Sequence, residues 1–181
     1  MKKEIVIVFI LILFVGGALT LKLTRGYILP LPIGVRHFIN TMFAPKDLYQ
    51  PIIVDNFLFH DRGFTKTYAI KPKHLDIYEM GILVDKGGIE STYKFNGKIK
   101  VEFFWKDKFL FENTVTTNDS ALYEHNDMSR YRQISLYKFN IPLQNKYTDD
   151  ISLKLTVLES DQKLDKYKDL INLYIAVSSV P

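Results

Sequence analysis

The feature that most constrains the fold of this chain is a strict alternation of apolar and polar residues in its second half. In residues 151–157, Ile, Leu or Val occupies every odd position, and Ser, Lys or Thr occupies every even one. The same period of two recurs in residues 97–105 and 171–178. Because successive side chains of a β-strand point to opposite faces, this pattern predicts strands that bury one face.

Less regular alternation predicts further strands and one hairpin. The turn Lys106–Lys108 joins residues 97–105 to residues 109–116, in which three apolar residues share one parity, so the two segments predict a hairpin. Most aromatic residues, Trp105 included, fall on apolar parities and are expected in the core. Four further strands are expected at residues 52–59, 64–70, 75–84 and 133–141.

Turns and short connections define the fold class. Gly and Pro residues in the segments 61–63, 71–73, 86–88 and 96–97 separate the apolar runs. Most connections are too short for crossover helices, so antiparallel pairing is expected. The eight strands predict an all-β chain, an antiparallel β-sandwich of Ig-like or jelly-roll type, over residues 47–181.

Two local features refine this prediction. In the strand expected at 133–141, the apolar parity changes between Leu136 and Tyr137, as a β-bulge requires. The segment 160–169 is either a single helical turn, with Leu164 and Tyr167 inward, or a solvated loop.

The N-terminal segment has a different character. The run from Ile5 to Leu21 contains no charge, and as a helix it spans about 25 Å, close to the ~30 Å hydrocarbon core of a bilayer. Residues 1–25 therefore predict a cytoplasmic tip and one transmembrane signal-anchor helix, with the rest of the chain outside the cytoplasm. Cleavage near Ala18, as in a signal peptide, is the alternative.

Residues 26–46 form the predicted connector between anchor and sandwich. Two prolines in Tyr27–Pro32 exclude a regular helix there. In residues 35–43, apolar side chains recur at helical spacing, which predicts a short amphipathic helix. This helix either lies on the membrane, binds a partner there, or covers the base of the following domain.

Charge and motifs exclude several functions. The net charge is +4, but the first 45 residues hold five basic residues and one acidic residue, so the rest of the chain is formally neutral and nucleic-acid binding is not expected. The chain has no cysteine and no G-x-S-x-G, H-E-x-x-H or P-loop motif, so we expect no enzyme, no cofactor and no metal. The segments His60-Asp61-Arg62 and His74-Leu75-Asp76 could each be part of an acid/base site, but without a nucleophile they are interpreted as polar surface residues of turns.

The candidate site lies in the loops 117–131 and 86–96. The first loop is long for a compact domain, which favours a role in recognition. Its one histidine has acidic neighbours, so a divalent cation site and an ordinary solvated loop are the alternatives. Because Tyr and Arg are enriched at binding hot spots, the predicted partner-binding residues are Tyr123, His125, Arg130 and Tyr131.

The C-terminal half resembles a known group of sequences. The segment RQISLYKFNIPL (132–143), the strand LKLTVLE (153–159) and the closing LYIAVSSVP (173–181) are similar to a family of uncharacterised bacterial envelope domains, anchored by a signal-anchor helix or a lipid. Some members resemble immunity proteins against secreted toxins. The resemblance implies a protein of the bacterial inner membrane, single-pass, with a periplasmic domain that binds a protein partner, a secreted toxin among the candidates. An envelope hydrolase or metal-dependent enzyme is the alternative.

Overall fold

The computed structural model describes residues 46–74, 76–85, 89, 93–116, 121–123, 131–140 and 151–178. The predicted transmembrane helix and the connector up to residue 45 lie outside these residues. Among the residues that are described, no helix is long and apolar enough to cross a membrane.

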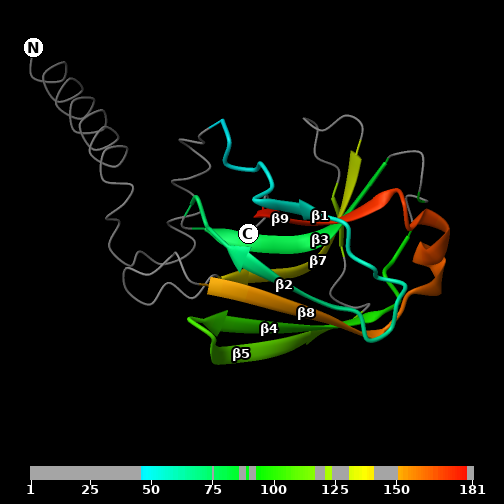
Figure 1. Ribbon diagram of the computed structural model, residues 1–181. Coiled ribbons are helices and arrows are strands. Elements are labelled where there is room, and N and C mark those ends of the chain that lie inside the picture. The colour runs from blue at the N-terminus through cyan, green and yellow to red at the C-terminus, as the bar shows by residue number, and fades with distance from the viewer. Residues whose placement is uncertain are drawn as a thin grey trace, which may run out of the picture.

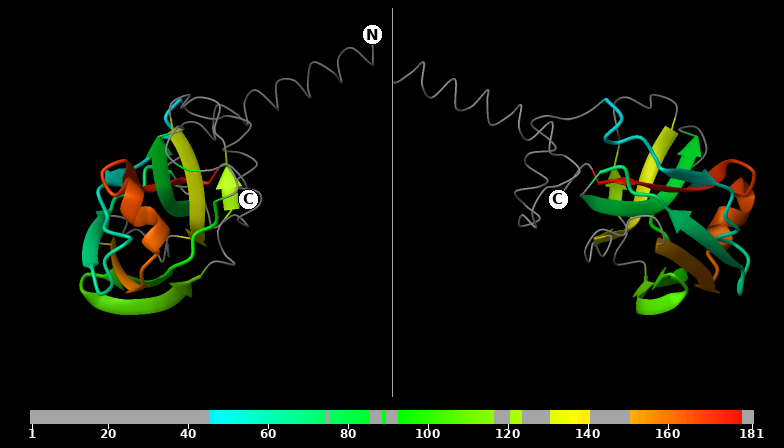
Figure 2. Two further views of the ribbon diagram at one scale, coloured as in Figure 1. Left: turned by 90° about the vertical axis from the view of Figure 1, so that its right-hand side faces the viewer. Right: turned by 60° about the vertical axis from the view of Figure 1, so that its left-hand side comes forward.

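The described part of the chain is an antiparallel all-β sandwich of two sheets (Figure 1). Sheet A has the strand order β1-β9-β3-β7-β6, and sheet B has the order β2-β8-β4-β5. Two further views show the same layers from the side (Figure 2). The strands are β1 (Ile53–Asp55), β2 (Thr65–Ile70), β3 (Ile77–Asp85), β4 (Lys98–Trp105), β5 (Lys108–Val115), β6 (Ala121–Tyr123), β7 (Tyr131–Asn140), β8 (Ile151–Glu159) and β9 (Ile171–Val177).

The strand pairs are nested along the sequence. β1 pairs with β9, β2 with β8, β3 with β7, and β4 with β5. Together these four pairs form one long antiparallel ribbon of two strands. When the ribbon folds back on itself, β3 also pairs with β9, and β4 also pairs with β8. Consecutive strands therefore alternate between the two sheets for the first four strands, from β1 to β4.

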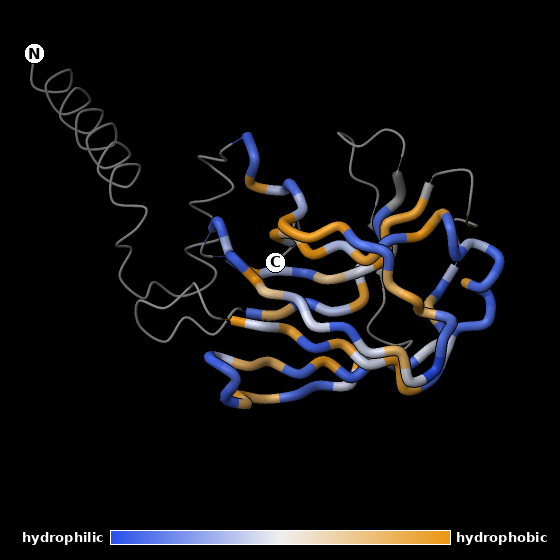
Figure 3. The backbone as a smooth tube through the Cα atoms, in the orientation of Figure 1, coloured by the Kyte–Doolittle hydropathy of each residue, from blue (hydrophilic) through white to orange (hydrophobic). Residues whose placement is uncertain are grey.

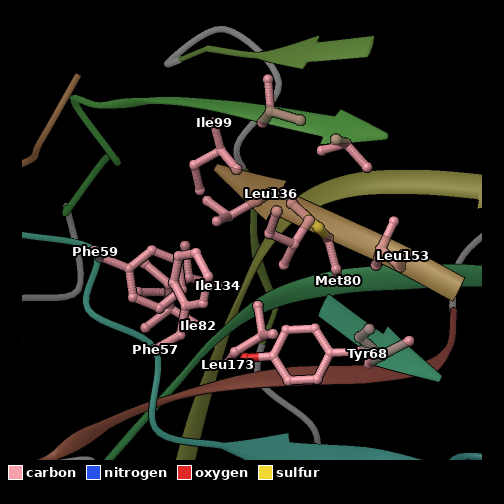
Figure 4. Close-up of a cluster of buried hydrophobic side chains, with 14 of the residues drawn as sticks. Phe57, Phe59, Tyr68, Met80, Ile82, Ile99, Ile134, Leu136, Leu153 and Leu173 are labelled. Carbon is pink, nitrogen blue, oxygen red and sulfur yellow. The ribbon is translucent and has the colours of Figure 1, made fainter. Parts of the chain in front are cut away.

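The core lies between the sheets, where the alternating apolar residues meet. Apolar and polar residues alternate along most of β8 in sheet B (Figure 3). In β8 the odd residues 151–157 are buried and the even ones are half-buried, as the period of two predicts. Figure 4 shows side chains of both sheets in contact with one another, with Met80 and Ile82 from sheet A and Ile99 and Leu153 from sheet B.

Two predicted irregularities are present. Met80 pairs with Tyr137 and Gly81 with Ser135, so Leu136 is the extra residue of a β-bulge, which confirms the predicted change of parity. Residues Gln162–Tyr167 form a 3-10 helix, η2, whose Leu164 is fully buried, so the helical alternative for this segment is correct.

Other predictions need correction. β1 covers three residues rather than eight, and β6 is a ninth strand inside the predicted loop 117–131. β6 has only three residues, too few for alternation to be recognised, and its pairing with β7 holds it in the sheet.

The start of β5 also differs from the prediction that Phe109 and Phe111 lie on the same face. Phe111 pairs with Phe103 but Phe109 pairs with Phe104, so Leu110 is a bulge and Phe109 lies on the other face from Phe111. Trp105, expected in the core, is only partly buried because it lies in the last row of sheet B.

The two ends of the sandwich differ, and we name them by their contents. The hairpin end carries the two-residue turn Lys106-Asp107, both with positive φ, as a tight hairpin of this length requires. The loop end carries the last residues of β3 and β6, the first residues of β4 and β7, and η2. Along the side between β1 and β2, an ion pair of 2.6 Å between Lys66 and Asp55 joins the two sheets.

Candidate functional site

The structure places the strand residues that border the two predicted contact loops next to each other. Asp85, the last residue of β3, pairs with Tyr131, the first residue of β7. The loop that follows Asp85 and the loop that precedes Tyr131 therefore leave sheet A at adjacent positions of the loop end. Tyr123 is in β6, opposite Gln133 of β7, so Tyr123 and Tyr131 belong to strands and not to a loop.

His125 and Arg130 lie outside the described residues, and of Tyr123 and Tyr131 only the backbone is described. The partner-binding role of these four residues remains a prediction. In the second predicted loop, 86–96, Ile89 and Phe95 are buried, so part of this segment belongs to the core rather than to a contact surface.

The base of that second loop is fixed by a buried carboxylate. Asp161, only 2% exposed, accepts hydrogen bonds from the hydroxyl of Tyr93 (2.6 Å) and the backbone N–H of Asn96 (2.7 Å). Its other oxygen accepts the backbone N–H of Lys163 and caps the helix η2. Burial, followed by the contact with Asp161, raises the pKa of Tyr93, so this hydroxyl keeps its proton. One carboxylate thus connects the loop that leads into β4 with the segment after β8.

The outer face of sheet A is buried over its central strands β9, β3 and β7, and it contains a second carboxylate. Glu79 of β3 is 3% exposed. It accepts hydrogen bonds from the hydroxyls of Tyr174 (2.9 Å), Ser178 (3.0 Å) and Ser135 (3.3 Å). These donors come from β9, from the residue after β9 and from β7, so the cluster joins the three central strands of the sheet. Its recorded partners in the described part of the chain are all hydroxyl groups.

Gly81 makes room for this cluster. A Cβ atom at this position would lie 2.1 Å from the carbonyl oxygen of Ile134 and 2.7 Å from the ring of Tyr174. The ring therefore lies directly against the backbone of β3, and its hydroxyl reaches Glu79.

The chemistry of the Glu79 cluster is structural. A serine becomes a nucleophile when a base removes its proton and a third group orients that base. Here the two serines and the tyrosine donate to the same carboxylate, an arrangement that satisfies a buried anion and orders the strands. The sequence analysis missed this cluster, although an acidic residue within the apolar run 77–84 was a signal for it.

One of the two histidines interpreted as turn residues, His74, contacts neighbouring segments of the fold. His74 lies at the hairpin end, where its Nε2 is 3.5 Å from a carboxylate oxygen of Asp47. Its carbonyl oxygen accepts a hydrogen bond from the hydroxyl of Tyr78, at 2.9 Å. His60 lies half-buried in the turn before Gly63. These contacts fix the turn at residues 46–50 to the connection between β2 and β3.

The outer face of sheet B carries a network of charges. Glu102 lies between Lys100 (3.1 Å) and Lys154 (3.2 Å), and Lys100 also contacts Glu112 (2.8 Å). Burial acts to raise the pKa of Glu102, but the hydrogen bonds and charges of the two lysines outweigh it and lower this pKa below its usual value. The contacts with Glu112 and Glu102 raise the pKa of Lys100. This arrangement resembles the exposed face of a soluble sheet.

Exposed apolar side chains are concentrated on β5. Among the described residues, five large apolar side chains are exposed, and Phe109 (49%), Leu110 (37%) and Phe111 (36%) are three of them. β5 is the edge strand of sheet B, and all its residues except the last are exposed. The run of three apolar residues in the sequence FLF, which interrupts the alternation, was the signal for this surface.

No group of three or more potential metal ligands is present among the described residues. No protein-family model, curated protein or solved structure matches this chain.

Proposed function

We propose that this chain is a membrane-anchored, extracytoplasmic β-sandwich that binds a protein partner through the loops of its loop end. The observation that carries the proposal is the pairing of Asp85 with Tyr131, because these two residues border the loops 86–96 and 117–131. Two loops far apart in sequence then contribute to one surface. Loops on a rigid scaffold are the usual site of recognition in sandwich domains.

The scaffold beneath this surface is well fixed. β3 is hydrogen-bonded to both β7 and β9, and the Glu79 cluster connects all three strands. Asp161 holds the base of the loop that precedes β4. A rigid base lowers the entropic cost of binding, because fewer groups have to be ordered when the partner arrives.

We infer that the sandwich is of the jelly-roll type rather than Ig-like. In an Ig-type sandwich the first two strands, A and B, belong to the same sheet. Here β1 belongs to sheet A and β2 to sheet B, and the nested pairs form one folded ribbon. The jelly roll hosts many unrelated functions, so the type of fold does not by itself assign one.

The proposed location follows from the proposed anchor. Ile5–Leu21 spans the inner membrane in this proposal, and residues 46–50 join the sandwich at its hairpin end through the contacts of Asp47 with Lys73 and His74. The loop end is opposite, and so faces away from the membrane toward an incoming protein. The resemblance to immunity-like envelope domains makes a secreted toxin the partner class to examine first.

Site-specific photo-crosslinking tests this function. A photoreactive amino acid replaces Tyr123 or Tyr131 in the full chain in native membranes, and Thr67, on the exposed outer face of sheet B, serves as the control position. We expect a discrete protein adduct from the first two positions and not from the third, and the adduct is lost when His125 and Arg130 are both changed to Ala.

Identical adducts from all three positions, or no adduct at all, would contradict the proposal. Turnover of a substrate by the purified chain in a metal-dependent manner would favour the enzyme alternative. A cytoplasmic reporter fused after Lys46 tests the topology separately, since its activity would place the sandwich inside the cell.

A further inference from the structure

The tip of the β4–β5 hairpin lies at the end of the sandwich where the chain enters. In the last row of sheet B, Trp105 pairs with Lys108 on one side and with Ile151 on the other, and Ile151 pairs in turn with Ile70. The connection after Ile70 contains the residues that contact Asp47. The turn at residues 46–50 and the hairpin tip therefore belong to the same end of the molecule, as Figure 1 also shows for the ends of β2, β4 and β8.

The tip combines apolar, aromatic and basic side chains. Phe109 and Leu110 are exposed, and the ring of Phe109 packs edge-on against Phe104 with 5.8 Å between centroids. Trp105 is partly buried, and the ammonium group of Lys106 lies 5.4 Å from the centroid of its ring. Aromatic rings with a polar edge and lysines with long apolar stems are the side chains that favour the interface between lipid and water.

In the described segments at this end, basic side chains outnumber acidic ones, which suits an anionic surface. Among the described residues 46–50, 70–77 and 104–109, all lysines are exposed. Two of the three acidic residues in these segments are already engaged, because Asp76 is buried and Asp47 contacts Lys73. The exposed lysines are Lys46, Lys71, Lys73, Lys106 and Lys108.

We propose that residues 104–111 dock on an anionic lipid bilayer, with Trp105, Phe109 and Leu110 in the interface and Lys106 and Lys108 at the phosphate groups. The inference rests on the proposed anchoring in one respect: 24 residues separate Leu21 from Lys46, so the anchor holds this end near the bilayer. A tether of this kind raises the effective concentration of the tip at the surface, so that a small apolar patch is sufficient. Docking would fix the sandwich with its loop end directed away from the membrane.

Trp105 is the one tryptophan of the chain, so its fluorescence reports on the tip alone. The full chain is reconstituted into vesicles of three parts phosphatidylcholine to one part phosphatidylglycerol, with or without bromine on the acyl chains. We expect the brominated lipid to quench Trp105, and high salt to remove the quenching. In the double variant K106Q/K108Q, the docking equilibrium constant falls about 25-fold, which is about fivefold for each lysine lost near an anionic surface.

Two controls give the result its meaning. The variant K166Q/K168Q removes two exposed lysines at the loop end and should leave the quenching unchanged. The variant F109S/L110S keeps the lysines and should reduce the quenching, while circular dichroism checks that the sheet is retained.

Each other outcome overturns the docking. If the chain floats with the vesicles but Trp105 is not quenched, the hairpin does not dock, although the anchor stands. If the chain does not float, both the anchor and the docking are wrong. If quenching is equally strong with phosphatidylcholine alone, or in K106Q/K108Q, anionic lipid is not the ligand. A protein adduct from a photoreactive residue at Leu110, without quenching, would assign this edge to a protein partner.

Discussion

Replacement of Asp161 by Ala should be among the most destabilising single changes at the loop end. The carboxylate accepts three hydrogen bonds, from Tyr93, Asn96 and Lys163, and is almost fully buried. A hydrogen bond to a charged group contributes about 1.5–3 kcal/mol, and a lost N-cap costs about 1 kcal/mol. Because Tyr93 and Asn96 lose their acceptor and η2 loses its cap, we expect D161A to lower the free energy of unfolding by about 4 kcal/mol.

The measurement is denaturant unfolding of the full chain in detergent micelles, followed by near-ultraviolet circular dichroism. The matched control is Asp165→Ala, which removes an exposed carboxylate from the same 3-10 helix and should change the stability by less than about 0.5 kcal/mol. A double-mutant cycle with Tyr93→Phe isolates one of the three bonds, and its coupling energy should be about 1.5–3 kcal/mol. Equal effects of D161A and D165A, or a coupling energy near zero, would refute the assignment.

The pH dependence provides an independent check on the same bond. Burial raises the pKa of Tyr93 above its usual value of 10.0. A raised pKa in the folded state means that the stabilisation is fully present below the pKa of the unfolded chain and is lost as the pH rises above it. The wild type should therefore lose stability relative to Tyr93→Phe above pH ~10, and a constant difference between the two proteins would contradict this.

Three further predictions concern the sheets. Gly81→Ala should lower the free energy of unfolding by more than about 3 kcal/mol, because the new Cβ would lie 2.1 Å from a backbone oxygen. Gly63 has open space around it but a φ of +87°, so Gly63→Ala should lower the free energy of unfolding by only about 1 kcal/mol. Thermal melts of the two variants test this difference. Phe103→Ala should lower the free energy of unfolding by about 3–5 kcal/mol, because Phe103 is fully buried. Trp105→Ala should lower it clearly less, because Trp105 is only partly buried. Denaturant unfolding that ranks the two variants in the opposite order would contradict the structure. The pKa of Glu102 is lower in the folded chain than its usual value of 4.5, so the ionised carboxylate stabilises the fold at a pH above 4.5. This contribution is lost as the pH falls through the lowered pKa. Acid unfolding of Glu102→Gln should therefore show a weaker pH dependence than that of the wild type.

The sequence by itself determined where most strands lie and which of their faces enters the core. The alternation in residues 151–157 predicts the buried and half-buried positions of β8 correctly, and the change of parity at Leu136 predicts the bulge in β7. Both signals are local, because the two faces of a strand follow from the direction of successive side chains. The segments β1 and β6 gave weaker signals, since three residues are too few to show a period.

Only the tertiary structure decided which strands are neighbours and what lies on the second face of sheet A. Alternation assigns a residue to a face but does not name the strand beside it, and the hydroxyls that meet Glu79 are 56, 95 and 99 residues away in the sequence. The same holds for the pairing of Asp85 with Tyr131, on which the proposed binding surface depends, and for Trp105, whose place in the last row of sheet B leaves it half-exposed. A polar residue in an apolar run finds its partners, and the residues that border two distant loops become neighbours, only when the ribbon is folded into two sheets.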